Sequence, residues 1–187
     1  MTTRTMRTTA ELEAALDHLR AAPTGAGELT LVVRRPERLE RELLVEGELD
    51  PEAGLVGDNW RSRATSRAVE EGRHHEAMLT LMSSRMVALL ADEDEERALA
   101  GDQLYVDLDL SVDHLPVGAR LALGDTALLE ITAKPHRGCK KFLARFGADA
   151  LAFVNSDEGS RLRLRGVYAR VLRGGVIHPG DVVRRLG

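Results

Sequence analysis

The sequence predicts a mainly β fold: a β-barrel with a few short helices and an N-terminal helix, which is α+β by content. Residues 101–186 contain five short apolar runs separated by glycine-containing turns, a pattern typical of barrels and sandwiches. The 187 residues are 43% hydrophobic and 30% charged, the composition of a folded chain. A chain of this length buries a core without a metal or a disulfide. We therefore expect one compact unit.

The first predicted element is a helix near the N-terminus. Thr8 and Glu11 have the spacing of a capping box, in which each side chain bonds the backbone N–H of the other residue. Leu12, Leu16 and Leu19 follow at helical spacing and form one apolar stripe. The proline and glycine that come next predict the end of this helix.

The segments between this helix and residue 100 predict strands, a loop and a second helix. Residues 28–35 read as a strand, and residues 39–50 fit a strand or a helix, of which we favour the strand. Residues 61–75 are polar and arginine-rich without an apolar period. This predicts an exposed loop or a lid that is mobile without ligand and closes over the site. Ser83 or Ser84 is a candidate N-cap for the helix that follows.

Two histidines and the single tryptophan lie in or beside this loop. His74 and His75 are adjacent, and no second pair is spaced to complete a metal site with them, so a solvated loop is favoured. Trp60 fits a core anchor better than the wall of a ligand cleft.

One helix is predicted among the C-terminal strands. In residues 138–147, Phe142, Leu143 and Phe146 have helical spacing, and Gly147 is a candidate terminator. The remaining runs of residues 101–186 read as short strands and predict a continuous barrel.

The predicted organisation has two parts in one unit. Residues 1–53 supply a helix and strands that pack on or extend the barrel, and residues 54–187 form the barrel domain. No apolar run has the length of a membrane span or of a secretory signal. The single cysteine excludes an internal disulfide, which favours a reducing compartment. We expect a cytoplasmic protein that does not bind membranes.

The net charge of −4 conceals a division along the chain. Residues 1–130 hold 14 Lys and Arg against 26 Asp and Glu, whereas residues 131–187 hold 12 against 4. A basic C-terminal third on an acidic protein predicts a local anionic ligand, because a nucleic-acid-binding domain is usually basic throughout. The alternative is that the acidic and basic segments neutralise each other in the fold.

The single cysteine lies in the most basic stretch of the chain. Cys139 has six Lys, Arg or His residues within six positions, and no carboxylate occurs between Glu130 and Asp149. It falls where a strand gives way to the first turn of the predicted helix, a place that favours thiolate over thiol. We therefore predict an exposed Cys139 with a lowered pKa. The alternative is an ordinary buried cysteine with a structural role.

Roughly residues 54–186 resemble the MOSC domain family, named for the C-terminal domain of molybdenum-cofactor sulfurases, and the C-terminal half of this match is the more specific. The resemblance rests on "GDQLYVDLDLSVDHLPVGARLALGDTALLEITAKPHRGCKKFLARFG" at residues 101–147 and "LRGVYARVLRGGVIHPGDVV" at residues 164–183. It implies a β-barrel and a cysteine, here Cys139, that either coordinates the molybdenum of a pterin cofactor or carries sulfur as a persulfide. Gln103 stands where the family pattern has asparagine, and the "HGG" segment of stand-alone members is absent.

The resemblance assigns candidate site residues. Cys139 is the candidate catalytic residue and metal ligand. The other candidates for contacts with the molybdenum cofactor (molybdopterin) are His136, Arg137 and Lys140, with Ser84, Arg85 and Gln103 as weaker ones. No pyridoxal-phosphate site or desulfurase domain is apparent, so any sulfur would come from another protein.

Three functions remain open at this point, and with them whether the protein is an enzyme. The first is a molybdenum-cofactor protein that reduces N-oxygenated small molecules or handles the cofactor. The second is a non-redox sulfur carrier with a persulfide on Cys139, and the third is a binding module that has lost the chemistry. The expected partners are a cysteine desulfurase or an electron-donor protein and a small-molecule substrate, with no nucleic acid.

Overall fold

The computed structural model describes residues 6–187, so the first five residues of the predicted N-terminal part lie outside the described residues. Its strands are β1 (Ala26–Arg34), β2 (Glu42–Leu44), β3 (Gly47–Asp50), β4 (Gly54–Leu55), β5 (Leu79–Ser83), β6 (Leu104–Asp107), β7 (Arg120–Leu123), β8 (Ala127–Ile131), β9 (Val167–Arg173), β10 (Gly175–Ile177) and β11 (Val182–Arg185). Its α-helices are α1 (Thr9–Ala14), α2 (Leu16–Arg20), α3 (Ser66–Glu70), α4 (Ser84–Leu90), α5 (Asp94–Arg97), α6 (Lys140–Asn155) and α7 (Asp157–Arg161). Single 3₁₀ turns are η1 (Arg61–Arg63), η2 (His74–Ala77) and η3 (Ala98–Ala100).

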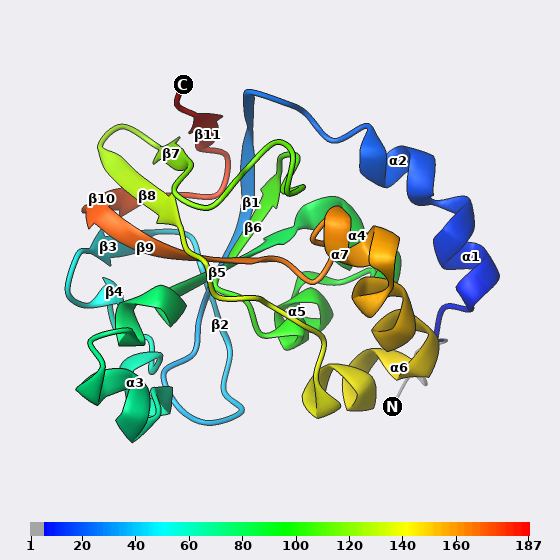
Figure 1. Ribbon diagram of the computed structural model, residues 1–187, viewed down its shortest axis with the longest axis horizontal. Coiled ribbons are helices and arrows are strands. Elements are labelled where there is room, and N and C mark those ends of the chain that lie inside the picture. The colour runs from blue at the N-terminus through cyan, green and yellow to red at the C-terminus, as the bar shows by residue number, and fades with distance from the viewer. Residues whose placement is uncertain (1–5) are drawn as a thin grey trace.

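Seven strands close into a barrel, as predicted (Figure 1). Their order around the barrel is β1, β6, β5, β9, β8, β7 and β11, and β11 pairs with β1 to complete the ring. The pairings are antiparallel except that of β5 with β6. Strand β2 pairs with one edge of β1 outside the ring, while β10, β3 and β4 form a separate small sheet.

The barrel is not built from residues 101–186 alone, which corrects that part of the prediction. Strands β1 and β5 come from the first half of the chain and lie on either side of β6. A barrel strand needs partners on both edges, and the run from residue 101 supplies only five of the seven strands. The ambiguous segment at residues 39–50 contains β2 and β3, as we favoured.

The helix around Phe142 is longer than predicted. It begins at Lys140 and continues to Asn155 through a kink at Gly147, whose φ of 90° suits glycine. Gly147 therefore ends the first helical segment, as expected, but a second segment follows directly. Phe142 and Phe146 pack against each other with ring centroids 4.9 Å apart.

Two hydrophobic cores fix the position of this helix. One fills the barrel, and the other lies between the outer face of the barrel and helices α1, α2, α4 and α6, which gather on one side of it, whereas α3 lies apart from them (Figure 1). Strand β1 serves both cores, since Leu29 and Val32 belong to the first while Leu31 and Val33 belong to the second. Phe142 anchors the start of α6 in the second core and so places Cys139 beside the barrel.

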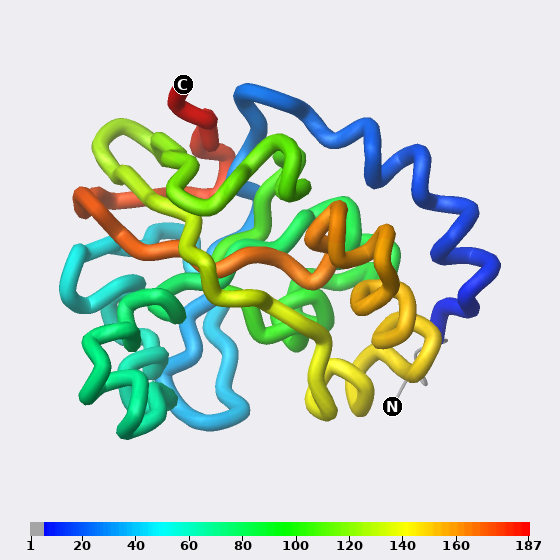
Figure 2. The backbone as a smooth tube through the Cα atoms, viewed as in Figure 1, coloured from blue at the N-terminus to red at the C-terminus, as the bar shows by residue number. Residues whose placement is uncertain are grey.

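The N-terminal helices cover the far side of the second core. The capping box at Thr8 and Glu11 is present, as predicted. The trace in Figure 2 runs past α6 and α7, where Thr9 N donates to Asp149 Oδ2 at 2.9 Å and Arg20 Nη2 lies 2.8 Å from Glu158 Oε1. Within residues 6–187, no helix is both long and apolar enough to cross a membrane.

Candidate functional site

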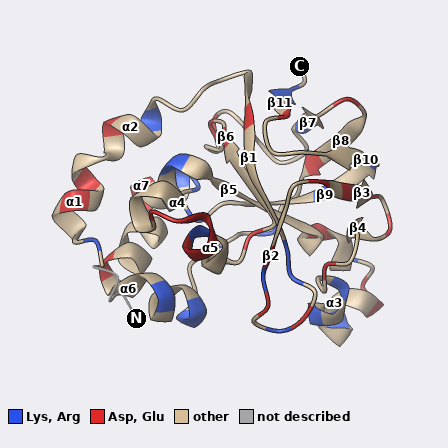
Figure 3. Cartoon of the chain, turned by 180° about the vertical axis from the view of Figure 1, so that it is seen from behind, with Lys and Arg blue, Asp and Glu red and all other residues tan. Residues whose placement is uncertain are grey.

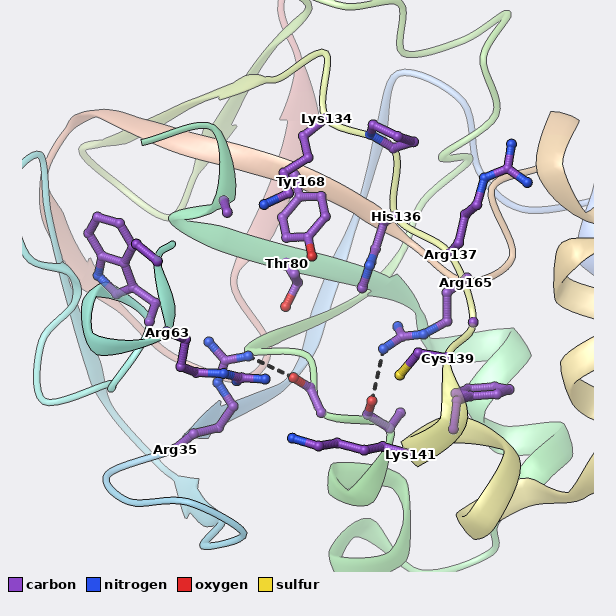
Figure 4. Close-up of a pocket in the computed structure, with 18 of the residues that line it drawn as sticks. Arg35, Arg63, Thr80, Lys134, His136, Arg137, Cys139, Lys141, Arg165 and Tyr168 are labelled. Atoms are coloured by element: carbon purple, nitrogen blue, oxygen red, sulfur yellow. Dashed lines mark hydrogen bonds between the residues drawn. The ribbon is translucent and has the colours of Figure 1, made fainter. Parts of the chain in front are cut away.

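A cavity of 460 Å³ opens beside the barrel, next to the start of α6 (Figure 4). Three segments form most of its wall: residues 134–139, which we call the strap; residues 60–77; and the first turns of α6. The lining residues are Arg35, Arg41, Trp60, Arg63, Ala64, Thr65, Ala68, His74, Ala77, Thr80, Ala100, Gly101, Lys134, Pro135, His136, Arg137, Gly138, Cys139, Lys141, Phe142, Arg145, Arg165 and Tyr168. We call this space the thiol cavity.

The wall of the thiol cavity is strongly cationic. Of the lining residues in the described part of the chain, eight are Lys or Arg and none is Asp or Glu. Figure 3 shows blue cationic positions at the start of α6 and in the segment before β2, and Lys141, Arg35 and Arg41 of these segments line the cavity. Concentrated positive charge in a concave, partly desolvated site attracts anions. The basic C-terminal third therefore does not simply neutralise the acidic part of the chain.

Cys139 lies at the N-cap of α6 and is exposed, which confirms its predicted placement. Partial burial opposes ionisation of the thiol, but the backbone N–H groups of Phe142 and Lys141 and the charges of Arg165 and Lys141 outweigh it. The pKa of Cys139 is therefore lowered, and the thiolate fraction at neutral pH is raised.

A buried carboxylate organises the floor of the cavity. Asp102 is fully buried, and its two oxygens accept hydrogen bonds from Arg165 Nη1 at 2.6 Å and His136 Nε2 at 2.8 Å. Burial opposes its ionisation, but Arg165 and His136 outweigh this and hold the pKa of Asp102 below its usual value. Burial, with the charge of Arg165, also lowers the pKa of His136. Because the ionised Asp102 only accepts, neutral His136 carries its proton on Nε2.

The backbone at Gly166 lets Arg165 reach this position. Gly166 has a φ of 108°, and a Cβ built there would lie 2.3 Å from the Leu81 carbonyl oxygen. Its chain neighbour Arg165 also donates from Nη2 to the Ala100 carbonyl at 3.0 Å. The Nε of Arg165 is buried and finds no hydrogen-bond partner among residues 6–187.

A second buried network supports the opposite wall. Arg35 Nη2 lies 2.7 Å from Asp58 Oδ1, and both side chains are buried. Gln103 Nε2 donates to the same oxygen at 3.2 Å and to the Met78 carbonyl at 3.1 Å. Gln103 Oε1 accepts from the Thr80 hydroxyl at 2.6 Å and the Thr80 N–H at 2.8 Å.

The structure brings together three of the predicted site residues. His136, Arg137 and Cys139 line the thiol cavity, all on or next to the strap. Asn155 holds the strap in place, since its side chain accepts from the Gly138 N–H at 2.9 Å and donates to the Gly138 carbonyl at 3.3 Å.

The other four predicted residues lie elsewhere. Lys140 is exposed and does not line the cavity; its neighbour Lys141 does, because successive helical residues point about 100° apart. Ser84 and Arg85 line a separate cavity, where Arg85 Nε lies 2.6 Å from Asp107. Gln103 is fully buried, and its amide is fully used within the protein.

Several cavity residues were not predicted. Arg165 and Tyr168 belong to the "LRGVYARV" stretch, whose arginine and tyrosine were a usable signal. Lys134 precedes Pro135 in the basic stretch and lies over the Tyr168 ring, with Nζ 5.1 Å from the ring centroid. Burial, with the charge of Asp102, raises the pKa of Tyr168, so its hydroxyl stays protonated at neutral pH.

The segment at residues 60–77 is mostly exposed, as predicted, but it is not an irregular loop. It contains η1, α3 and η2, and it contributes Trp60, Arg63 and His74 to the cavity wall. Trp60 is buried as a core anchor, as favoured, but it also lines the cavity. His74 stacks on Trp60 with ring centroids 6.3 Å apart and is only partly exposed, so its side chain is less solvated than we predicted.

The donor set fits an anionic cofactor with its own metal ligands better than a bare metal ion. Among residues 6–187, no group of three or more His, Cys, Asp and Glu side chains is placed to hold a metal. Cys139 supplies one soft thiolate ligand, and the cationic wall suits a phosphate. A volume of 460 Å³ lies within the usual range of about 300–1,000 Å³ for cofactor sites.

Comparisons with known proteins identify the family and the fold of the chain. The MOSC domain model matches residues 74–184. Among solved structures, the YuaD protein from Bacillus subtilis has a TM-score of 0.57 at 14% identity, with 84% of this chain and 94% of that chain covered. YiiM from Geobacillus stearothermophilus has a TM-score of 0.57 at 15% identity, covering 87% and 75%.

YiiM from Escherichia coli has a TM-score of 0.53 at 18% identity, covering 86% of this chain and 70% of that chain. These structural similarities concern the fold. No curated protein sequence matches this chain. The family model covers more than half of the chain and includes the strap, Cys139, Arg165 and Tyr168. The chain therefore belongs to the MOSC domain family.

Proposed function

We propose that the thiol cavity binds a molybdenum–pterin cofactor, with Cys139 as the protein ligand to the metal. One observation carries this proposal: an exposed cysteine with a lowered pKa lines a cavity to which residues 6–187 contribute eight cationic side chains and no carboxylate. Thiolates suit soft metals, and arginines suit phosphates.

The residues of this chain would divide the work. Cys139 would hold the metal, while Arg137, Arg63 and Lys141 would neutralise the anionic part of the cofactor. When bound, the cofactor supplies two-electron redox chemistry. The segment at residues 60–77 borders the cavity and would limit the access of water to it.

Two side chains would orient a small substrate. Neutral His136, fixed by Asp102 through Nε2, presents Nδ1 as an acceptor. The protonated Tyr168 hydroxyl is a donor, and the His136 and Tyr168 rings pack with centroids 4.6 Å apart. We propose the reduction of N-oxygenated small molecules, with electrons from a separate donor protein, as the reaction that family membership suggests.

Metal analysis tests the proposal. After expression in a host that makes the cofactor, the wild-type protein should retain molybdenum through purification, and Cys139→Ser should not. Lys140→Met, which changes an exposed charge next to Cys139 without altering the cavity wall, is the matched control and should load normally. Wild-type protein without molybdenum under these conditions would refute the proposal.

A second candidate function is favoured by the exposure and lowered pKa of the thiol, which suit a nucleophile. In this case Cys139 would carry sulfane sulfur received from a cysteine desulfurase. Intact mass after incubation with a desulfurase and cysteine would then show one added sulfur on the wild type and none on Cys139→Ser. That adduct, in a protein that never retains molybdenum, would favour the carrier.

A further inference from the structure

A second cavity of 280 Å³ adjoins the thiol cavity. Three cationic residues, Arg41, Arg63 and Lys141, line both cavities, so the two share a wall. The residues that line the second cavity are Glu37, Arg38, Leu39, Arg41, Asn59, Ser62, Arg63 and Lys141. We call this cavity the annex.

The cations of the annex have almost no acidic partners. The side chains of Arg38, Arg63 and Lys141 make no hydrogen bond or ion pair with any residue among 6–187. Within the described residues, the Arg41 side chain donates only to backbone carbonyls, those of Glu40 and Ala98. Glu37 is the one acidic lining residue, and it forms no ion pair among residues 6–187.

Mutual repulsion accompanies this arrangement. Burial, together with Arg145, Arg35 and Arg63, lowers the pKa of Arg41 to about 10. Burial, together with Arg63, Arg38 and Arg145, lowers the pKa of Lys141. Cations that repel one another and have no acidic partner are stabilised when a multivalent anion binds among them, because the anion relieves their repulsion.

The neutral polar groups of the annex add little to anion binding. The Ser62 hydroxyl already donates to the Asn59 carbonyl at 2.9 Å, and the buried Asn59 Oδ1 is an acceptor, which a phosphate dianion cannot satisfy. The cations of the annex therefore carry its affinity for an anion.

We propose that the annex is a phosphate subsite in which Arg38, Arg41, Arg63 and Lys141 bind the dianionic phosphate monoester of a ligand whose reactive end reaches Cys139. A dianion matches a group of three or four cations better than a carboxylate does, and guanidinium forks bind phosphate oxygens in pairs. The shared wall allows one molecule to occupy both cavities. The phosphate belongs either to the cofactor or to a phosphorylated substrate; the first assignment rests on the proposed function, whereas phosphate binding itself does not.

Titration of the cofactor-free protein with phenyl phosphate, in a phosphate-free buffer of low ionic strength, tests the subsite. Phenyl phosphate should bind more tightly than phenyl sulfate, a monoanion of similar shape. Arg63→Gln and Lys141→Met should each weaken binding by about tenfold or more, the loss expected for one charged hydrogen bond. Circular dichroism checks that each variant is folded.

The chain offers matched controls for both variants. Arg61→Gln changes an arginine of the same turn whose side chain faces Glu52 at 3.6 Å, and Lys140→Met changes the neighbouring lysine, which does not line the annex. Both should leave binding within about twofold. Absence of phenyl phosphate binding by the wild type would overturn the proposal. So would losses confined to Lys134→Met, which lies on the strap side of the thiol cavity.

Two further arms identify the source of the phosphate. Cys139→Ser should still bind phenyl phosphate, so failure of molybdenum loading would refute the proposed function and leave the subsite intact. In molybdenum-loaded protein, loss of phenyl phosphate binding assigns the subsite to the cofactor. Unchanged binding in the loaded protein assigns it to a phosphorylated substrate.

Discussion

Arg165 Nη1 lies 2.6 Å from Asp102 Oδ2, and both side chains are buried. Removing one member of a buried ion pair leaves the other uncompensated in a poorly solvated place. Here the ion pair joins the segment before β6 to the segment before β9, with His136 of the strap as the third member. The pair therefore holds three walls of the site in register.

Arg165→Met should destabilise the protein by about 3–5 kcal/mol, because Asp102 stays buried without its guanidinium. Urea unfolding measures this loss. Arg170→Met is the control, since Arg170 pairs with Glu130 at 2.7 Å on the surface and should cost at most about 1 kcal/mol. Equal losses in the two variants would contradict the structural role of the buried pair.

The free energy of unfolding should fall as the pH is lowered below about 6.5, the ordinary pKa of histidine. The pKa of His136 is lowered in the folded state by burial and by Arg165, so in this window the unfolded state binds the extra proton. The stability is complete above pH ~6.5 and is lost as the pH falls toward the folded pKa. His136→Gln should flatten the dependence between pH 7 and about 5.

His75 provides the comparison, because burial lowers its pKa as well, although it is surrounded by much less protein than His136. His75→Gln should flatten the pH dependence less than His136→Gln does. Asp102 contributes to stability in a separate pH window. Because its pKa is lowered in the folded state, this contribution is present above pH ~4, the ordinary pKa of aspartate, and is lost only as the pH falls below that value. A wild-type stability that stays flat down to pH 5 would refute the histidine contribution.

Alkylation of Cys139 by iodoacetamide should show a midpoint below the ~8.5 of an unperturbed thiol. The cause is the backbone N–H groups and the charges that outweigh partial burial of the sulfur. Cys139→Ser should change the free energy of unfolding by no more than about 0.5 kcal/mol, because the side chain is exposed. A thiol that reacts only after unfolding would show that Cys139 is structural.

Gln103→Leu should destabilise the protein by roughly 2–4 kcal/mol, because the Thr80 N–H and the Met78 carbonyl lose their buried partners. Molybdenum content per folded molecule should be unchanged, since Gln103 does not line the thiol cavity. Ser84→Ala, outside both networks, is the control. If the Gln103→Leu protein folds but does not bind molybdenum, Gln103 contacts the cofactor directly, as the resemblance suggested.

Local patterns were sufficient to predict the fold class and the cysteine. The capping box at Thr8 depends on residues three positions apart, and the placement of Cys139 depends on the helix that begins next to it. Glycine-separated apolar runs predicted the barrel strands because short strands and tight turns leave a local signal.

The rest of the site depends on contacts that the sequence does not display. Arg165 and Asp102 are 63 positions apart, and Arg35 and Asp58 are 23 apart, so no local pattern reveals that these charges are buried and paired. Lys140 and Lys141 are adjacent in the sequence, which does not show that only Lys141 faces the cavity. Whether an amide such as Gln103 faces a ligand or the core also follows only from the assembled barrel.

The pairing of β1 with β11 has a consequence for the newly made chain. The barrel closes only when the first and last of its strands meet, so a nascent polypeptide cannot complete the ring until β11 has emerged from the ribosome. Until then the edges of β1 and β7 that β11 covers remain open, and unpaired edges recruit other chains into aggregates. These two edges are therefore the last of the barrel to be shielded from pairing with other chains.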